Sequence, residues 1–450
     1  MIGVNFKEQM QATDLTIIDK LYRLLTKEKD GERVCKDITA DACTYVPRNF
    51  FIQVLSQIFT KLGDTLSNPK TVLTWLMSYV SAPVFLISLI VPIRESGSMV
   101  PQVLFARFIN RRAIRKWIWV AGSFLQFLSI ASMGLIALYF EGTTAGWLII
   151  AALVIFSLAR SISSIVSKDI TGKTIPKTRR GQLKGYAVSA SGILVLVAGL
   201  FMLYKSKSEA TISFYSAIMF FASATWLIAA VIYSRIREFP DEHASENKEG
   251  EGMLSHFSLL KTNRQFRDFI IARTLLLCTA LSAPFYVLLA QEHVGKELYL
   301  LALFIIARGI ASIISSPVWG KYADRSSKNV MAIAVTMASV LGIVAFFVIT
   351  YMKELRSVNW IYPLAFFILG IAHQGVRLGR KTYIIDMAAG NQRTIFVSVS
   401  NTIIGIILLF VGSLSALVSL LSVEGVVLLL SILGLLGAYK SYQLPNAEKD

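Results

Sequence analysis

The chain has 450 residues, of which 54% are hydrophobic and only 16% are charged, and its mean hydropathy is +0.59. Soluble domains carry about 25% charged residues, so this composition excludes a soluble globular protein and indicates a helical protein with several membrane spans. The formal net charge of +17 would suit a nucleic-acid partner, but the basic residues collect in short loops between apolar stretches, which excludes that partner. The three cysteines lack metal-ligand spacing, so we expect no metal and no cofactor.

Residues 1–46 are polar and precede the first apolar stretch, which predicts a cytoplasmic N-terminal extension. Thr13 and Asp14 are suited to cap a helix. The apolar positions that would share one face of this helix are Ile17, Leu21, Leu24 and Leu25. We expect the helix to lie on the bilayer or on the inner loops of the protein, and a helix that binds a regulatory partner is the alternative.

The first membrane helix is interrupted in the sequence by Asn68-Pro69-Lys70. Hydropathy alone would start the helix at Thr71, but the residues that precede Ala106 are enough for two spans and a tight turn. We therefore predict one helix over residues 50–78. Asp64 then lies near the middle of the membrane.

Eleven further apolar stretches follow, each close to the 20 residues that cross a membrane core. They are residues 82–106, 117–140, 146–166, 185–204, 211–234, 266–290, 297–319, 329–351, 358–378, 394–420 and 423–442. The total of twelve predicts an all-α membrane protein built from two six-helix halves, residues 47–235 and 265–450. Residues 236–264, rich in Glu, Lys and Ser, are expected to be a cytoplasmic linker.

The basic residues lie mostly in the connections after helices 2, 4, 8 and 10. They are Arg107, Arg111, Arg112, Arg115, Lys116, Lys168, Lys173, Lys177, Arg179, Arg180, Lys184, Lys321, Arg325, Lys328, Arg380, Lys381 and Arg393. The turns after helices 3 and 11 carry only Glu141 and Glu424 as charges. Positive loops stay in the cytoplasm, so both termini are predicted to be cytoplasmic, and the loops are expected to contact anionic membrane lipids.

One loop pattern occurs twice, 214 residues apart, each time between two apolar stretches. The second copy contains Gly320, Asp324 and Arg325, and the first contains Asn110 and Arg111. A tight turn between helices favours glycine for close backbone approach, and an acid that caps a helix and pairs with neighbouring cations. We expect these five residues to form gating loops in a two-fold repeated protein.

The stretch Gly320-Lys-Tyr-Ala-Asp324-Arg325-Ser-Ser-Lys328 resembles the G-x-L-A-D-R-x-G-R/K loop of the major facilitator superfamily, with Tyr322 in place of Leu and Ser327 in place of the second Gly. The resemblance covers residues 50–442 and is typical of a bacterial-type permease. It implies two pseudo-symmetric six-helix bundles, a monomer in the cell inner membrane, and a small-molecule substrate bound between the halves near mid-depth.

Arg94 and Arg308 are the candidate substrate-binding residues. They are also 214 residues apart, each twelve residues before its loop, which is about 18 Å along a helix and close to mid-membrane. A cation there costs about 2.5–3.5 kcal/mol unless it faces a cavity or a partner. The pair predicts an anion site, and nitrate-type and organophosphate-type facilitators resemble this use of paired cations. The alternatives are that Glu95 or another acid neutralises Arg94, and that Arg308 bonds helix carbonyls.

Asp64 and Glu95 are the candidate proton-coupling residues, because a carboxylic acid in a low-dielectric site can take up and release a proton near neutral pH. Many facilitators resemble this use of an acid in the first helix. The alternative for Asp64 is a cap for the break at Asn68-Pro69. The alternative for Glu95 is an intrahelical partner of a nearby cation.

Arg160 with Asp169, and Arg377 with Asp386, repeat the same spacing at an offset of 217 and are expected to be structural charge pairs. Arg160 resembles the fourth-helix arginine of the superfamily's second motif. Arg273 is expected to extend towards the inner interface.

An enzyme would need a nucleophile with its base or a cluster of ligands, and the sequence shows neither with the required spacing. We therefore predict a secondary active transporter that moves a small solute, with an anion favoured, by alternating access coupled to protons or another ion. The alternatives are an exporter of drugs or lipids on the same fold, and a membrane sensor or scaffold that does not transport.

Overall fold

The computed structural model describes residues 17–26, 38–102, 105, 109, 112–205, 211–240, 258–387 and 392–447, and within these ranges the chain is almost entirely helical and has no β-strand. The first half contains α2 (Ala40–Thr44), α3 (Val46–Leu66), α4 (Val72–Tyr79), α5 (Val84–Met99), α7 (Lys116–Tyr139), α8 (Gly142–Thr174), α9 (Lys177–Lys205) and α10 (Ile212–Ser234). The second half contains α12 (Leu259–Thr262), α13 (Arg264–Leu275), α14 (Cys278–Leu281), α15 (Ala283–His293), α16 (Leu298–Tyr351), α17 (Lys353–Arg356), α18 (Ile361–Met387), α19 (Gln392–Val418) and α20 (Val423–Gln443).

Ten of the described helical segments are long and apolar enough to cross a membrane. The remaining two spans are the broken pair α3 and α4, and the 16-residue helix α5. The twelve predicted spans are thereby confirmed, and the chain is a multi-pass integral membrane protein.

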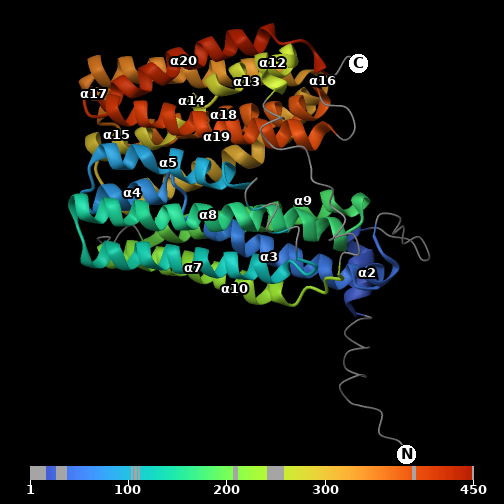
Figure 1. The fold of residues 1–450 in the computed structure, drawn as a ribbon. Helices are drawn as coiled ribbons and strands as arrows, with labels where there is room; N and C mark the ends of the chain where they lie inside the picture. Colours follow the sequence, from blue (N-terminus) through green and yellow to red (C-terminus); the bar gives the residue numbers. More distant parts are fainter. Residues whose placement is uncertain are drawn as a thin grey trace, which may run out of the picture.

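The spans form two bundles that lie side by side (Figure 1). Helices α3 to α10, coloured blue to green, make one bundle, and α13 to α20, coloured yellow to red, make the other. The bundles contact through α5 and α19, α9 and α16, and α4 and α15. Helix α2 and the last turn of α20 lie at the same end of the molecule, which we call the terminal end (Figure 1). We call the opposite end, where α17 lies, the far end.

The first membrane helix is not the single helix over residues 50–78 that the sequence predicts. It begins at Val46 and breaks between Leu66 and Val72. Pro69 has no backbone N–H to continue a helix, and polar side chains bond the backbone groups that the break exposes. The Lys70 amide donates to Asn68 Oδ1 (2.9 Å), and Thr74 Oγ1 donates to the Pro69 carbonyl (2.6 Å). The first helix of the second half is also broken, into α13, α14 and α15.

Helices α5 and α19 approach closely because small residues lie where they meet. A Cβ built on Gly412 would lie only 2.0 Å from Pro92 Cγ, so a larger residue would push the bundles apart. Towards the far end of the same contact, Ser88 Oγ donates to Ser419 Oγ (3.0 Å). These contacts hold α5 against the opposite bundle and fix where its charged residues lie.

The loop that contains Gly320 is shorter than predicted, because helix runs on both sides up to a kink at Ser326 (φ −164°, ψ 100°). The expected close approach at Gly320 is wrong, since a Cβ there would meet no atom within 4 Å. The kink is held by Lys328 Nζ, which donates to the Leu444 carbonyl (2.8 Å). Arg325 is exposed. The Asp324 side chain, Asn110 and Arg111 lie outside the described residues.

Residues 17–26 form a helix that lies against the terminal end of the first bundle. Tyr22 is 1% exposed and packs edge to face on Phe50, with 5.3 Å between ring centroids. Arg179 Nη1 donates to the Thr26 carbonyl (2.7 Å). Ile17, Leu21 and Leu24 are exposed, so this apolar face does not make the contact with the bundle, and the placement of the helix on the bilayer stays a prediction. Thr13 and Asp14 lie outside the described residues.

Candidate functional site

Asp64 lies between two arginines of the first bundle. Its Oδ1 accepts from Arg94 Nη2 (2.8 Å) and its Oδ2 accepts from Arg160 Nη2 (2.6 Å), which joins α3 to α5 and α8. Each guanidinium also lies over an aromatic ring, that of Arg94 over Phe156 (4.4 Å) and that of Arg160 over Trp226 (5.2 Å). Arg94 is therefore neutralised by an acid, and that acid is Asp64 rather than Glu95. Both carboxylate oxygens are used in this way, so the Asp64 side chain does not cap the break.

The predicted pairing of Arg160 with Asp169 is wrong. Both residues lie on α8, and nine residues of helix separate them by about 13 Å along the axis, which is too far for an ion pair. Asp169 instead accepts from Arg115 Nη1 (2.5 Å) and forms an ion pair with Lys173 Nζ (3.3 Å) at the terminal end. Arg377 and Asp386 have the same spacing on α18, where both are exposed, so the role predicted for this pair stays a prediction.

A chain of hydrogen bonds crosses between the bundles at the break in the first helix. Lys70 Nζ lies 3.3 Å from His373 Nε2, and His373 Nδ1 lies 3.4 Å from Thr279 Oγ1. An ammonium group only donates, so Nε2 must accept, and a neutral imidazole then carries its proton on Nδ1 and donates to Thr279. Thr279 Oγ1 donates in turn to the Leu276 carbonyl (3.1 Å). The chain connects the first bundle to α18 and to the broken helix α14.

The groups around this chain form what we call the central charged cluster. Its members are Lys70, Asp64, Arg94, Glu95, Arg160, Arg308, Arg377 and Arg380. The cluster contains six cations and two carboxylates, and Asp64 already forms ion pairs with two of the cations. Lys70 is 8% exposed and lies in the field of Glu95, Arg308 and Arg380. The cluster therefore holds an excess of positive charge, which burial makes costly without a counter-anion.

Arg308 and Glu95 are the members with unused bonding capacity. Arg308 Nη1 is buried, and the Arg308 side chain makes no hydrogen bond within the described part of the chain. The alternative in which Arg308 bonds helix carbonyls is therefore not found among these residues. The Glu95 carboxylate lies close to the charges of Lys70, Arg94 and Arg380 but forms no ion pair or hydrogen bond with any described residue. The two unpaired groups lie within electrostatic reach of each other.

Arg273 contributes to the second bundle in a different way. It is 6% exposed, so the expectation that it extends towards the interface is wrong. Its guanidinium donates to Ser400 Oγ and, through Nη2, to Asn401 Oδ1 (2.8 Å), which ties α13 to α19.

Four lysines lie closer to the terminal end, three of them in the first bundle and one in the second. They are Lys61, Lys168, Lys184 and Lys381. Lys61 lies within electrostatic range of Arg377, and Lys381 within range of Lys168 and Lys184, although these partners belong to opposite bundles. The positive field of the central charged cluster therefore continues towards the terminal end, where it would attract anions.

Sequence reasoning missed Lys70 and misplaced Arg380. The signal for Lys70 was the motif Asn68-Pro69-Lys70 itself, because a cation at a break within a membrane span faces neither lipid nor a regular helix surface. Arg380 was assigned to the loop after helix 10, but α18 continues to Met387. The extra turns of helix bring Arg380 within electrostatic range of Glu95.

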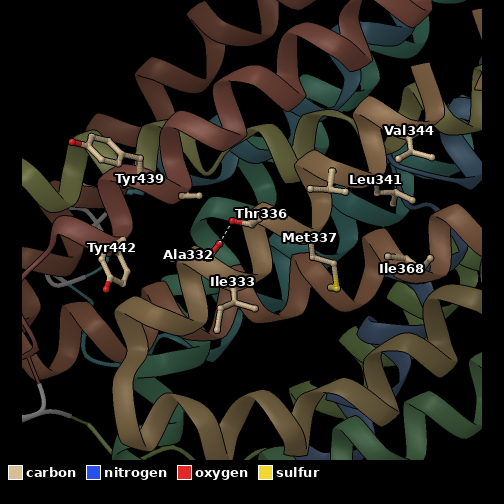
Figure 2. A pocket seen from close by; sticks show the side chains of 11 residues that line it. Ala332, Ile333, Thr336, Met337, Leu341, Val344, Ile368, Tyr439 and Tyr442 are labelled. Carbon is tan, nitrogen blue, oxygen red and sulfur yellow. Dashed lines mark hydrogen bonds between the residues drawn. The ribbon is translucent and has the colours of Figure 1, made fainter. Parts of the chain in front are cut away.

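A groove of about 820 Å³ lies on the outside of the second bundle (Figure 2). Apolar residues of α16, α18 and α20 line it, among them Ile333, Met337 and Ile368, with Tyr439 and Tyr442 at one end (Figure 2). Ile333 is 57% exposed. A groove of this composition on a membrane protein suits lipid acyl chains, and it contains no member of the central charged cluster.

The fold and the central charged cluster define a polytopic helical protein in which charges are held between two bundles, as in membrane transporters. The family model of the Major Facilitator Superfamily matches residues 53–376. The chain belongs to the Major Facilitator Superfamily, and the predicted family is confirmed. It is a membrane transporter and not an enzyme.

Solved structures of other family members are similar in fold. A D-xylose–proton symporter superposes with a TM-score of 0.67 at 12% identity, covering 89% of this chain and 98% of the symporter. The nucleoside transporter NupG gives 0.63 at 14% identity, covering 87% and 98%. A POT family transporter in complex with a thioalcohol-conjugated peptide gives 0.67 at 10% identity, covering 87% and 95%. No curated protein matches this chain.

Proposed function

We propose that the protein is a secondary active transporter that moves a small anionic solute by alternating access, coupled to protons. The observation that carries the proposal is the excess of cations in the central charged cluster, together with an Arg308 guanidinium whose Nη1 has no partner among the described residues. An anion bound there offsets the desolvation and mutual repulsion of the cations, whereas a cationic or neutral solute leaves both costs in place.

Arg308 is the proposed main substrate ligand, supported by Lys70 and Arg380. A guanidinium presents a planar fork of donors that suits carboxylate, nitrate or phosphate oxygens. Arg94, the other candidate from the sequence, keeps its proposed role in a second step, because it must first separate from Asp64. Lys70 belongs to the first bundle and Arg308 to the second, so one anion held by both would link the bundles.

Glu95 and Asp64 are the proposed proton-coupling residues. An anion that enters among Lys70, Arg94 and Arg380 competes with the Glu95 carboxylate for the same charges, which favours protonation of Glu95. Proton and anion then bind together, as symport requires. Protonation of Asp64 would release Arg94 and Arg160 for the substrate, and we assign it the later step because two ion pairs must break.

We further propose that the terminal end is cytoplasmic, in a monomer in the cell inner membrane with residues 47–235 and 265–450 as its bundles and 236–264 as the linker. The far end, where Lys296 Nζ donates to the Ser78 carbonyl of the other bundle (2.6 Å), is then the closed outer side. Asp324 and Arg325, with Asn110 and Arg111, are the proposed gating residues on the inner side.

The test is a thermal-shift screen of the purified protein against inorganic anions, carboxylates, phosphate esters, amines and lysolipids. We expect anions to stabilise the wild type and Arg308→Lys to weaken their binding by about 1–3 kcal/mol, the cost of a charge-assisted hydrogen bond. The matched control is Arg264→Lys, since the Arg264 side chain is 87% exposed at the start of α13. If only amines or lysolipids stabilise the protein, the anion proposal is wrong and the exporter alternative is favoured.

A further inference from the structure

Another pocket, lined by both polar and apolar side chains, lies at the far end between the two bundles. Its volume is about 480 Å³. Ser78 and Val84 line it from the first bundle, and Gln291, Glu292 and Glu424 line it from the second. It contains no member of the central charged cluster, and the contact between Lys296 and Ser78 that closes the far end lies at its edge.

Gln291, which lines this pocket, and His293, which lies two residues further along α15, have buried polar atoms without hydrogen-bond partners within the described part of the chain. Gln291 is 6% exposed, and neither its Oε1 nor its Nε2 forms a hydrogen bond. His293 Nε2 is also buried without a hydrogen bond, because the 3.9 Å to Glu424 Oε1 is too long for one. Both groups are therefore free to bond a ligand that enters this end of the molecule.

The carboxylates of Glu292 and Glu424 and the imidazole of His293 converge on one point. One ligand atom from each residue lies within 4.8 Å of the other two. Atoms bound to a single zinc ion at about 2.0–2.2 Å lie roughly 3.4 Å apart in a tetrahedron, so small side-chain rotations bring these three into range. Imidazole with carboxylate ligands favours transition-metal ions over calcium or magnesium, which prefer oxygen alone.

We propose that Glu292, His293 and Glu424 bind a divalent transition-metal ion, with the Gln291 amide oxygen available as a fourth ligand. Two carboxylates and a neutral imidazole balance the charge of such an ion. Lys296 is the one cation that lines the pocket, and its Nζ is bonded to the Ser78 carbonyl of the other bundle.

The metal would connect the end of α15 to the start of α20. Helix α15 also contacts α4 of the first bundle, and Ser88 meets Ser419 near the same pocket. An ion bound here would fix α15 to α20, and α15 must move when the far end opens. Metal binding is therefore expected to favour the closed far end, whatever solute the protein carries.

The test uses full-length protein purified without a histidine tag, stripped with chelator and titrated with Zn²⁺ by calorimetry. We expect one Zn²⁺ per chain in the wild type. His293→Gln and Glu424→Gln should each weaken binding by at least about tenfold, since losing even an outer partner of a ligand costs that much. Ca²⁺ is expected to bind far more weakly than Zn²⁺.

The matched control is Glu141→Gln, which removes an exposed carboxylate that precedes α8 at the same end of the molecule. It should bind Zn²⁺ like the wild type. A wild type that binds no Zn²⁺, or variants that bind it unchanged, would overturn the proposal. Melting temperatures of the metal-free variants show whether each has folded, and Glu292→Gln provides a third ligand variant if one of the others has not.

Discussion

Arg94 and Arg308 occupy equivalent positions in the two halves, yet their surroundings differ. Arg94 is paired with Asp64, which also holds Arg160, and rests on the Phe156 ring. Arg308 has a buried Nη1 with no partner among the described residues. Arg94 thus has an acidic partner within its own bundle, whereas Arg308 has a buried nitrogen that remains available among the described residues. The repeat in the sequence predicts equal depth for the two arginines, but only the neighbours on other helices decide which one can bind a ligand.

The largest expected effect comes from removing Asp64, the acid that pairs with Arg94. Asp64→Ala leaves Arg94 and Arg160 partly buried and repelling each other, because both lose their counter-ion. Removing one partner of a buried ion pair costs about 3–5 kcal/mol, so the melting temperature in detergent should fall steeply. The control is Glu95→Gln, which breaks no ion pair found in the structure. Equal melting temperatures for the two variants would mean that the Asp64 contacts contribute little.

A smaller effect distinguishes the two arginines directly. Arg94→Lys should reduce stability by about 1–3 kcal/mol, because an ammonium cannot reproduce the guanidinium contact with Asp64 and the stacking on Phe156. Arg308→Lys should leave the melting temperature without ligand nearly unchanged, because it breaks no hydrogen bond of the described residues. If both variants lose the same amount of stability, the two arginines do not differ in their contacts as described.

The contact between Lys70 and His373 tests how strongly the bundles are coupled at the centre. A double-mutant cycle with Lys70→Met and His373→Gln measures how much the interaction contributes to the free energy of unfolding. We expect a coupling of about 1.5 kcal/mol, the lower end for a hydrogen bond to a charged group, because the distance of 3.3 Å is long. Additive effects of the two variants would show that the contact does not hold the bundles together.

Much of the fold is predictable because membrane spans are set by length and hydropathy. Stretches such as residues 423–442 match the observed helix α20 closely, and the positions of Arg94 and Arg308 follow from the repeat. The break at Pro69 was visible as a motif, but its consequence for Lys70 depends on α18, more than 300 residues further along the chain. Asp64 was recognised as deep and acidic, while its two partners depend on the packing of α5 and α8. Long-range pairing of this kind has no local signature in one sequence.

The smallest expected effect concerns a charge network outside the membrane spans, at the terminal end of the first bundle. Glu238 follows α10, and its carboxylate accepts from the backbone amides of Arg115 (2.9 Å) and Lys116 (2.7 Å) at the start of α7. Lys173 Nζ lies 3.8 Å away. Burial raises the pKa of Glu238 above its ordinary value, although the bonds from both amides oppose that shift. Burial therefore outweighs the partners of this carboxylate.

A raised pKa in the folded protein means that folding favours the protonated form of Glu238. Its contribution to stability is fully present below the unfolded pKa of about 4.3 and is lost as pH rises through the folded pKa. We expect Glu238→Gln to remove this pH dependence, so the melting temperature should change less with pH just above pH 4. The corresponding change in the free energy of unfolding is on the order of 1 kcal/mol or less. Glu354→Gln, which alters an exposed acid at the far end, is the control and should leave the profile unchanged. If the melting temperature falls more steeply with rising pH in Glu238→Gln than in the wild type, the amide and lysine contacts outweigh burial.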